Sequence, residues 1–260
     1  MVLCDGAYAT LLGDRLPAGL LVDELIERDP NAVLDAHRAY IDAGARRIHS
    51  PTLTTCRLPD RVRRGRYVEA IAILREAAAG SQCELAVTMG ASSDEPRRYW
   101  ADLELVMESG IDRIAWLTVA SSAEALACAR AWSDVVVGNG CSATATLSLG
   151  LWDRKPPSGD TPSINHGMVK LCEQLRACGL DRQLELGLNC GWGIEGLHSA
   201  AETLSDAWGA PIHLAPSTGV GDVRASRDEW CDELRALARP ELVSSYGGCC
   251  GTDPTWIGEL

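Results

Sequence analysis

The chain has 260 residues, 46% of them hydrophobic, which is enough apolar material for the core of one large domain. Its 36 acidic residues exceed the 24 basic ones, and the resulting net charge of −12 argues against a surface that binds nucleic acid by neutralising phosphates. No apolar run approaches the ~20 residues needed to cross a bilayer, and the first residues lack the basic region and apolar length of a signal peptide. We therefore expect a cytoplasmic protein with no membrane partner.

Short β-rich runs recur along the chain, and segments with helical spacing lie between them. The strand candidates are residues 1–4, 46–50, 84–89, 113–119, 134–139, 184–189, 211–216 and 241–246. The helix candidates are residues 32–45, 67–80, 121–132, 163–179 and 226–238. Eight strands alternating with helices predict a single (β/α)₈ TIM barrel over residues 1–260. A doubly wound sheet is the main rival, but "CDGAYAT" (4–10) is not the glycine-rich phosphate loop expected after its first strand.

In a (β/α)₈ barrel the active site forms at the C-terminal ends of the strands. The polar residues that follow the predicted strands should therefore converge on one pocket. These residues are Asp5, His49, Ser50, Thr52, Asn139, Asn189, Cys190, Ser217, Tyr246, Cys249 and Cys250.

Three cysteines in this set stand out among the eleven of the chain. An odd number of cysteines scattered through apolar segments does not suit a disulfide scaffold, and most of them are expected to be buried small hydrophobes. Cys249 and Cys250, however, are adjacent within the glycine-rich "YGGCCGT" (246–252), where glycine permits backbone conformations closed to other residues. Cys190 follows the sixth predicted strand, and in a barrel only one strand separates the sixth strand from the eighth.

Three thiolates with one open position would make a catalytic zinc site. Zinc keeps a coordinated sulfur in the thiolate form, which is the nucleophile, so a substrate thiol at the fourth position would be activated for alkylation. A redox pair, a packing coincidence and a labile site for another soft metal remain open from spacing alone.

Five arginines crowd "RLPDRVRRGR" (57–66), at positions 57, 61, 63, 64 and 66. The plain interpretation is a solvated helix start. The alternative is a clamp for a charged co-substrate, because arginine suits phosphate and carboxylate.

The sequence resembles the homocysteine S-methyltransferase family, which includes betaine–homocysteine methyltransferase and the homocysteine-binding module of cobalamin-dependent methionine synthase. The segments that carry the resemblance are "GLNCG" (187–191), "YGGCCGTDP" (246–254), "CDGAYAT" (4–10) and "HRAYIDAGARRIHSPTLTT" (37–55), so it runs across nearly the whole chain. It implies one zinc per chain, held by Cys190, Cys249 and Cys250, with no catalytic residue beyond these ligands. The implied substrate-binding residues are Asp5, Gly6, Ser50, Thr52, Leu117, Asn189 and Tyr246, of which Asp5 helps hold the amino-acid part of homocysteine.

The departures from the family pattern fall on the substrate pocket. The family's "TNTF" is "SPTL" (50–53), its G-S-x-G-P is "TMGASS" (88–93), and its strand-four "ET" is Leu117-Thr118. The acid that meets the substrate ammonium is thus missing. Unless another acid fills the gap, we expect only weak discrimination in favour of an α-amino group.

The expected function is that of a zinc-dependent S-methyltransferase (methionine biosynthesis) acting on homocysteine or a related small thiol. The methyl donor stays open among S-methylmethionine, S-adenosylmethionine, a betaine-like compound and a methyl-corrinoid, and a corrinoid or folate route would need a separate partner protein. The alternatives are a methyltransferase for another thiol and a non-catalytic zinc- or thiol-binding subunit of a larger complex. Relatives continue into an eighth helix where this sequence stops at Leu260. We therefore also expect an uncovered groove beside strands eight and one. Either a second subunit covers this groove, in a homo-oligomer or a hetero-complex, or the sequence is a truncated module.

Overall fold

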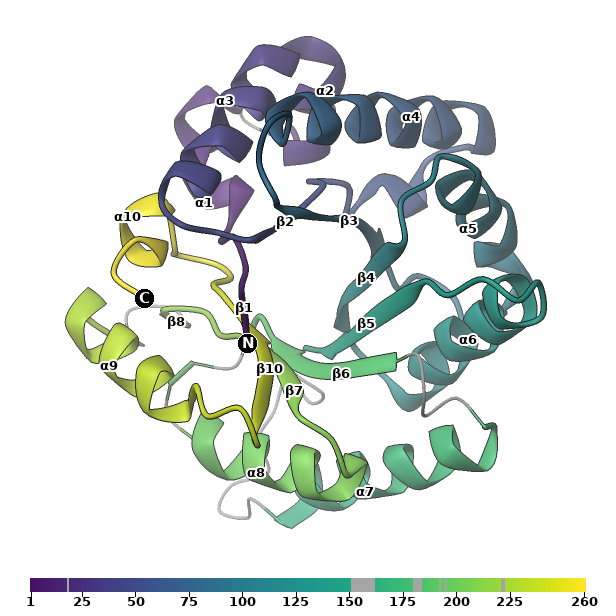
Figure 1. Ribbon diagram of the computed structural model, residues 1–260, viewed down its shortest axis with the longest axis vertical. Helices are drawn as coiled ribbons and strands as arrows, with labels where there is room; N and C mark the ends of the chain where they lie inside the picture. The colour runs from purple at the N-terminus through teal and green to yellow at the C-terminus, as the bar shows by residue number, and fades with distance from the viewer. Residues whose placement is uncertain (18, 151–161, 180–183, 192, 195, 221–222) are drawn as a thin grey trace.

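The computed structural model describes residues 1–260 except 18, 151–161, 180–183, 192, 195 and 221–222. Eight parallel strands form a nearly closed barrel with helices around it (Figure 1). These strands are β1 (Val2–Leu3), β2 (Arg47–His49), β3 (Glu84–Gly90), β4 (Arg113–Val119), β5 (Thr144–Leu149), β6 (Leu184–Asn189), β7 (Ile212–Ala215) and β10 (Val243–Tyr246). Their order is β1-β10-β7-β6-β5-β4-β3-β2, and a parallel bridge between Cys4 and Arg47 joins the two ends of the sheet. The predicted (β/α)₈ barrel is confirmed.

The helices lie on the outside of the sheet (Figure 1). They are α1 (Tyr8–Leu11), α2 (Leu25–Arg28), α3 (Pro30–Asp42), α4 (Asp60–Ala77), α5 (Arg97–Glu108), α6 (Ser122–Trp132), α7 (Pro162–Ala177), α8 (Leu197–Trp208), α9 (Arg227–Leu237) and α10 (Pro254–Ile257). Single turns of 3₁₀ helix cover Gly13–Arg15, Val22–Glu24 and Thr55–Arg57, a π turn covers Ser133–Val137, and β8 (Gly219–Val220) pairs antiparallel with β9 (Val223–Arg224).

Local sequence signals account for several helix starts. Asp29 accepts a hydrogen bond from the backbone N–H of Ala32 and precedes Pro30 at the first position of α3. A capping box of Ser226 and Glu229 begins α9. All five predicted helices are present, whereas the longer helices α5 and α8 and the single-turn helices α1, α2 and α10 were not predicted.

One predicted strand is wrong. Residues 134–139 do not form the fifth strand: α6 runs on through a π turn to Val137, and the strand that enters the sheet is β5. Cys128, Trp132, Val135 and Val136 are buried at helical spacing, so the valines complete the apolar face of a helix rather than a strand. Asn139 is therefore exposed, and its amide donates to the Val135 carbonyl at 2.6 Å instead of facing the pocket.

The arginine-rich segment at the start of α4 is not a free cationic surface. The side chains of Arg63 and Arg66 are buried, with Arg63 Nε 2.8 Å from Asp102 Oδ1 and Arg66 Nη2 3.0 Å from Glu27 Oε1. Because acids of this chain already pair with these two arginines, the anion-clamp interpretation is wrong for them. Arg61 and Arg64 are exposed, as the plain interpretation predicts.

The space beside β1 and β10 is occupied by the C-terminal residues. Helix α10 lies between α3 and α9 (Figure 1), where Ile257 is fully buried against the cluster formed largely by α3 and α4. Trp256 packs edge-on against Trp230 of α9, with ring centroids 5.6 Å apart. The expected uncovered groove is thus filled among the described residues, and the expectation of an oligomer loses the support that this groove gave it.

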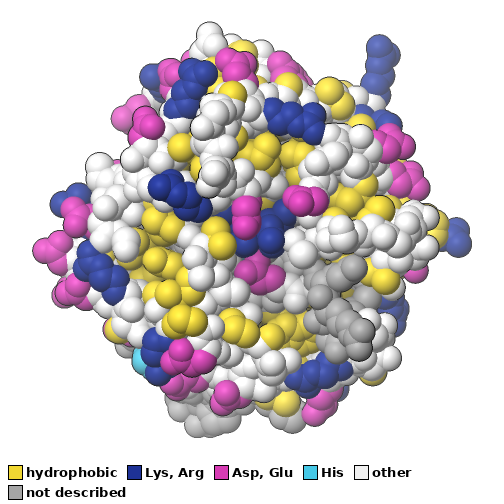
Figure 2. All heavy atoms as spheres, viewed as in Figure 1, with side chains coloured by type: hydrophobic (Ala, Val, Ile, Leu, Met, Phe, Trp, Pro, Cys, Tyr) yellow, Lys and Arg dark blue, Asp and Glu magenta, His cyan; other side chains and the backbone are white. Residues whose placement is uncertain are grey.

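No helix in the described part of the chain combines the length and the apolar character needed to cross a membrane. On the face drawn in Figure 2, acidic and basic side chains are interspersed, with hydrophobic side chains between them. Such a mixture differs from the clustered basic surface typical of nucleic-acid binding.

Candidate metal centre and substrate pocket

The segment that follows β10 bends its backbone around the paired cysteines. The N–H of Gly248 donates to the Asp5 carbonyl at 3.0 Å, and the N–H of Cys249 donates to the Pro216 carbonyl at 3.0 Å. The N–H of Thr252 then turns back to the Cys249 carbonyl, also at 3.0 Å. These bonds tie the loop to the ends of β1 and β7, so the position of the thiols is set by the barrel itself.

Glycine is needed in this loop for two different reasons. A Cβ atom at Gly248 would collide with the side chain of Thr252, which folds over the loop. Gly251 has φ +91°, a backbone conformation that residues with a side chain adopt only with strain. The glycines on either side of the cysteine pair therefore permit the tight turn that lets two adjacent thiols face one point.

The three predicted cysteines come together at the mouth of the barrel. Cys190 follows the last residue of β6, and its Sγ lies 3.3 Å from Sγ of Cys250. The Sγ atoms of Cys190, Cys249 and Cys250 all lie within 4.8 Å of one another, and Cys250 is exposed. The N–H of Thr218 donates to the Cys250 carbonyl at 3.0 Å and holds this end of the cluster.

This spacing fits a single tetrahedral metal ion. Sulfurs bound to one zinc at about 2.3 Å lie roughly 3.8 Å apart, within the range that these three atoms occupy. Hydrogen bonds from Cys190 and Cys249 lower the pKa of Cys250, whereas hydrogen bonding to Cys190 and Cys250 raises the pKa of Cys249 well above its usual value. A divalent cation at this point would stabilise all three sulfurs as thiolates.

A cavity of about 160 Å³ adjoins Cys249 and Cys250. Its polar lining comes from Asp5, His49, Ser50, Thr88 and His213. Its apolar walls include Val22, Leu53, Leu117 and Ala215. Sites for drug-sized ligands measure about 300–1,000 Å³, so this cavity suits a smaller molecule.

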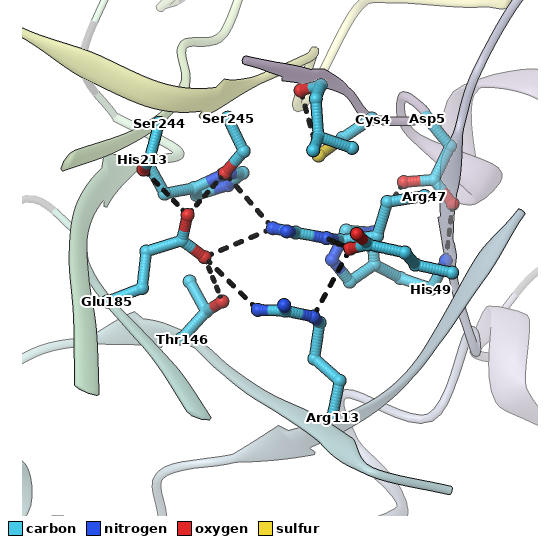
Figure 3. A network of polar contacts seen from close by, with 12 residues as sticks. Cys4, Asp5, Arg47, His49, Arg113, Thr146, Glu185, His213, Ser244 and Ser245 are labelled. Atoms are coloured by element: carbon cyan, nitrogen blue, oxygen red, sulfur yellow. Dashed lines mark hydrogen bonds and ion pairs between the residues drawn. The ribbon is translucent and has the colours of Figure 1, made fainter. Parts of the chain in front are cut away.

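Asp5 is the centre of a buried hydrogen-bond chain. Its Oδ1 lies 2.7 Å from Nδ1 of His49 (Figure 3). Its Oδ2 accepts from the His49 backbone N–H and the Tyr8 hydroxyl, each at 2.7 Å. The Tyr8 oxygen in turn lies 2.6 Å from Nδ1 of His37. Burial of Asp5 thus comes with three protein partners, and its carboxylate meets the cavity alongside His49.

The hydroxyl groups of Ser50 and Thr52 hydrogen-bond to the neighbouring strand. Ser50 Oγ accepts from the Thr88 N–H at 2.9 Å, and Thr52 Oγ1 donates to the Thr88 carbonyl at 2.6 Å. The two hydroxyls lie 2.6 Å apart, so Ser50 must donate to Thr52. Both side chains therefore hold the ends of β2 and β3 together.

Asn189 stabilises an irregular strand end. Its Oδ1 accepts from the Thr118 N–H at 2.9 Å, and its Nδ2 donates to Thr118 Oγ1 at 3.0 Å. Thr118 has φ +59°, and the pairing of β4 with β5 shifts register between Trp116 and Val119. This bulge lies next to Leu117, which lines the cavity.

Four of the seven predicted substrate residues line the cavity, namely Asp5, Gly6, Ser50 and Leu117. Thr52 and Asn189 instead hydrogen-bond to the neighbouring strands as described above. Tyr246 packs against the main core cluster. The roles of all seven in binding substrate stay predictions. Sequence reasoning placed His49 near the pocket but gave it no role, and it missed Tyr8, Thr88 and His213. The one sequence signal for Tyr8 was its place three residues after Asp5.

Comparison with known proteins agrees with this arrangement. A model of the homocysteine S-methyltransferase family matches residues 2–260. The chain is similar in structure to the homocysteine methyltransferase MmuM from Escherichia coli, in its metallated form (TM-score 0.76, 19% identity, 100% of this chain and 95% of that chain) and its apo form (TM-score 0.74, 21% identity, 100% and 94%). It is also similar to a dihydropteroate synthase from Anaplasma phagocytophilum (TM-score 0.62, 14% identity, 99% and 95%). At these identities the structural likeness shows the fold alone.

Proposed function

Because the chain belongs to the homocysteine S-methyltransferase family, we propose that it is a zinc-dependent enzyme that methylates homocysteine or a related small thiol. Residues 1–260 would act as one barrel domain in the cytoplasm, with one zinc per chain held by Cys190, Cys249 and Cys250. The observation that carries the proposal is the convergence of three Sγ atoms within 4.8 Å beside a small cavity. The metallated form of MmuM, a protein of similar fold, is consistent with it.

Zinc, when bound by three thiolates, leaves one position for a substrate sulfur and keeps that sulfur deprotonated at neutral pH. The residues of this chain do the rest. The loop 246–252 fixes the cysteines through backbone hydrogen bonds to Asp5 and Pro216. The walls of the cavity hold the tail of the thiol and exclude water, which strengthens the nucleophile by removing its hydration shell.

The reaction itself is a displacement at a methyl carbon. A sulfur–carbon bond forms while the bond from the methyl group to its donor breaks, and the donor leaves with the electron pair. The thiol proton leaves to solvent when the substrate binds. With homocysteine as acceptor the product is methionine, and with another thiol it is the corresponding thioether.

Two features of the pocket restrict the acceptor. The cavity of about 160 Å³ favours a thiol with a short tail. Leu117 lines the cavity where relatives carry an acid, and this substitution is the reason to keep a second thiol as the alternative acceptor. The donor stays open among S-methylmethionine, S-adenosylmethionine, a betaine-like compound and a methyl-corrinoid supplied by a separate protein, as does the choice between homo-oligomer and hetero-complex.

The test is methyl transfer with a panel of thiols and donors, with metal content measured on the same preparation. We expect about one zinc per chain, and we expect activity that a chelator removes and zinc restores. Mass spectrometry of the methylated thiol identifies the acceptor. Full activity in a zinc-free preparation would refute the zinc site, and no transfer to any thiol from any donor would refute the proposed reaction.

A further inference from the structure

Two residues that line the cavity each have a buried polar atom without a hydrogen-bond partner among the described residues. These atoms are Nε2 of His49 and Oγ1 of Thr88. The two residues are 6% and 2% exposed, and they lie near the ends of the adjacent strands β2 and β3. Buried polar groups are normally hydrogen-bonded, so unpaired ones that line a ligand cavity point to groups of the ligand.

The hydrogen-bond chain behind His49 fixes the role of its free nitrogen. A carboxylate only accepts hydrogen bonds, so Nδ1 of His49 must donate to Asp5 across the 2.7 Å contact. The Tyr8 hydroxyl donates its hydrogen bond to Asp5, so its oxygen can only accept from Nδ1 of His37. Burial lowers the pKa of His37 to about 4, which keeps that ring neutral. In the imidazole tautomer that donates from Nδ1, Nε2 can only accept a hydrogen bond, and His49 lines the cavity.

Other polar side chains around the cavity already have hydrogen-bond partners. The hydroxyl of Ser50 is bonded to Thr88 N–H and to Thr52, and Nδ1 of His213 lies 2.9 Å from Ser245 Oγ. Leu117, on the neighbouring strand β4, offers no polar atom. The acceptor at Nε2 and the hydroxyl at Thr88 are therefore the groups of this lining best placed to meet a donor on the substrate.

We propose that His49 Nε2 and Thr88 Oγ1 form the subsite that takes the amino group of the acceptor thiol, an inference that rests on the function proposed above. Two N–H groups of the amine would donate to these two atoms. Asp5 acts through His49 as a positioning residue: it holds the ring tautomer, and its negative charge lies on the far side of the ring from the amine. The pair thus takes the part of the acid that is absent at Leu117, and the preferred acceptor is an amino thiol such as homocysteine.

The experiment compares the binding of two thiols to zinc-loaded protein by calorimetry. Homocysteine is measured against 4-mercaptobutyrate, which has the same chain without the amino group. A hydrogen bond from a charged donor predicts that wild type binds homocysteine at least about tenfold more tightly. His49→Phe, which keeps a ring but removes the acceptor, should bring this ratio near one and leave the affinity for 4-mercaptobutyrate within about twofold.

Two further variants separate recognition from structural damage. Thr88→Val removes only the hydroxyl and should reduce the preference for homocysteine about three- to tenfold. His49→Gln, whose amide offers an acceptor oxygen, should recover part of the preference lost in His49→Phe. A merely structural role would weaken both thiols equally, which overturns the inference, and so does an unchanged ratio in His49→Phe and Thr88→Val.

Failure of the proposed function would look different. If zinc-loaded protein binds homocysteine preferentially but transfers no methyl group, the subsite stands and the proposed reaction fails. If wild type binds both thiols equally, the subsite is overturned and the reaction is unaffected. If it binds neither thiol, both are overturned.

Discussion

The polar groups at the two ends of the barrel interior differ in whether they have hydrogen-bond partners within the protein. Near the N-terminal ends of the strands, Arg47 contacts Glu185, Glu84 and Ser245 at 3.0, 2.8 and 3.0 Å (Figure 3). Glu185 also accepts hydrogen bonds from Thr146, Ser244 and Ser245 at 2.6, 2.7 and 2.8 Å. At the C-terminal ends, His49 Nε2 and Thr88 Oγ1 have no partner among the described residues, and three thiols lie close together.

This difference separates stability from function within one barrel. A fully paired ionic network closes the end where no chemistry is expected, and unpaired groups remain at the end where barrel enzymes place their active sites. Partners supplied by the protein stabilise the fold, whereas partners left to be supplied from outside indicate binding. Substitutions at the two ends should therefore affect different measurements.

The largest effect is expected from the cysteines at the mouth. Cys190→Ala, Cys249→Ala and Cys250→Ala should each reduce methyl transfer to the background rate, because each removes one of three proposed metal ligands. Circular dichroism and the unfolding midpoint should change little, since the barrel has its own core. Cys128→Ala is the matched control: this thiol is buried in the core, so its loss should cost stability and spare the metal. Retention of zinc and activity in any of the three variants would break the comparison.

At the opposite end, Glu185→Gln should cost about 3–5 kcal/mol of unfolding free energy, because it removes the buried charged partner of Arg47 and leaves only the half-exposed Glu84. The natural control is Glu84→Gln, which alters the same arginine through a partner whose side chain is 43% exposed. An exposed pair is worth about 0–1 kcal/mol. Denaturant unfolding measures both, and equal losses would show that burial does not decide the value of these pairs.

The same network gives stability a pH dependence. Burial alone would raise the pKa of Glu185. The charges of Arg47 and His213 and the hydroxyl donors outweigh burial and hold this pKa well below its usual range. A depressed carboxyl pKa stabilises the fold above the unfolded pKa of about 4.3, and this contribution is lost as pH falls below that value. Burial also lowers the pKa of His213 to about 3, which weakens the fold as pH falls below about 6.5. Unfolding from pH 7 to pH 3 should therefore show a steeper loss of stability in wild type than in Glu185→Gln. Parallel curves would contradict this assignment.

Much of this architecture could be predicted from sequence, because it depends on local periodicity and on motifs. Seven of the eight strand positions were predicted, and the cysteine cluster followed from "YGGCCGT" and "NC" once a barrel was assumed. The fifth strand was mistaken because Val135 and Val136 have high strand propensity, and only their packing with Trp132 makes them helical. The pairs Asp5–His49 and Asn189–Thr118 join residues 44 and 71 positions apart, and no local pattern specifies such pairings.

Asn189 gives a structural test at the mouth. Asn189→Ala should cost about 1–3 kcal/mol of stability, because it leaves the Thr118 N–H and hydroxyl without partners at a strained backbone position. In a Thr118→Gly background the same change should cost less, since glycine adopts a positive φ without strain. A double-mutant cycle in denaturant measures this coupling. Additive losses would mean that Asn189 acts on something other than this bulge, and substrate binding would then be the better interpretation.

The smallest expected effect concerns Leu117, which faces the same cavity as His49. Leu117→Glu places an acid where the resemblance to the family predicts one, so an amino group would gain a charged acceptor in addition to His49. A hydrogen bond to a charged group is worth about 1.5–3 kcal/mol, but burial of the new carboxylate offsets part of this gain. We therefore expect the preference for homocysteine over 4-mercaptobutyrate to rise only about threefold to tenfold, measured as the ratio of the two kcat/KM values. Leu117→Gln is the matched control, with the same shape as glutamate and no charge, and it should leave the ratio within about twofold of wild type.

If Leu117→Glu changes nothing while His49→Phe removes the preference, the amine lies wholly on the His49 side of the cavity. If Leu117→Glu instead restores the preference in a His49→Phe background, positions 49 and 117, on β2 and β4, serve the same amino group. His49 would then do in this barrel what an acid at position 117 would otherwise do.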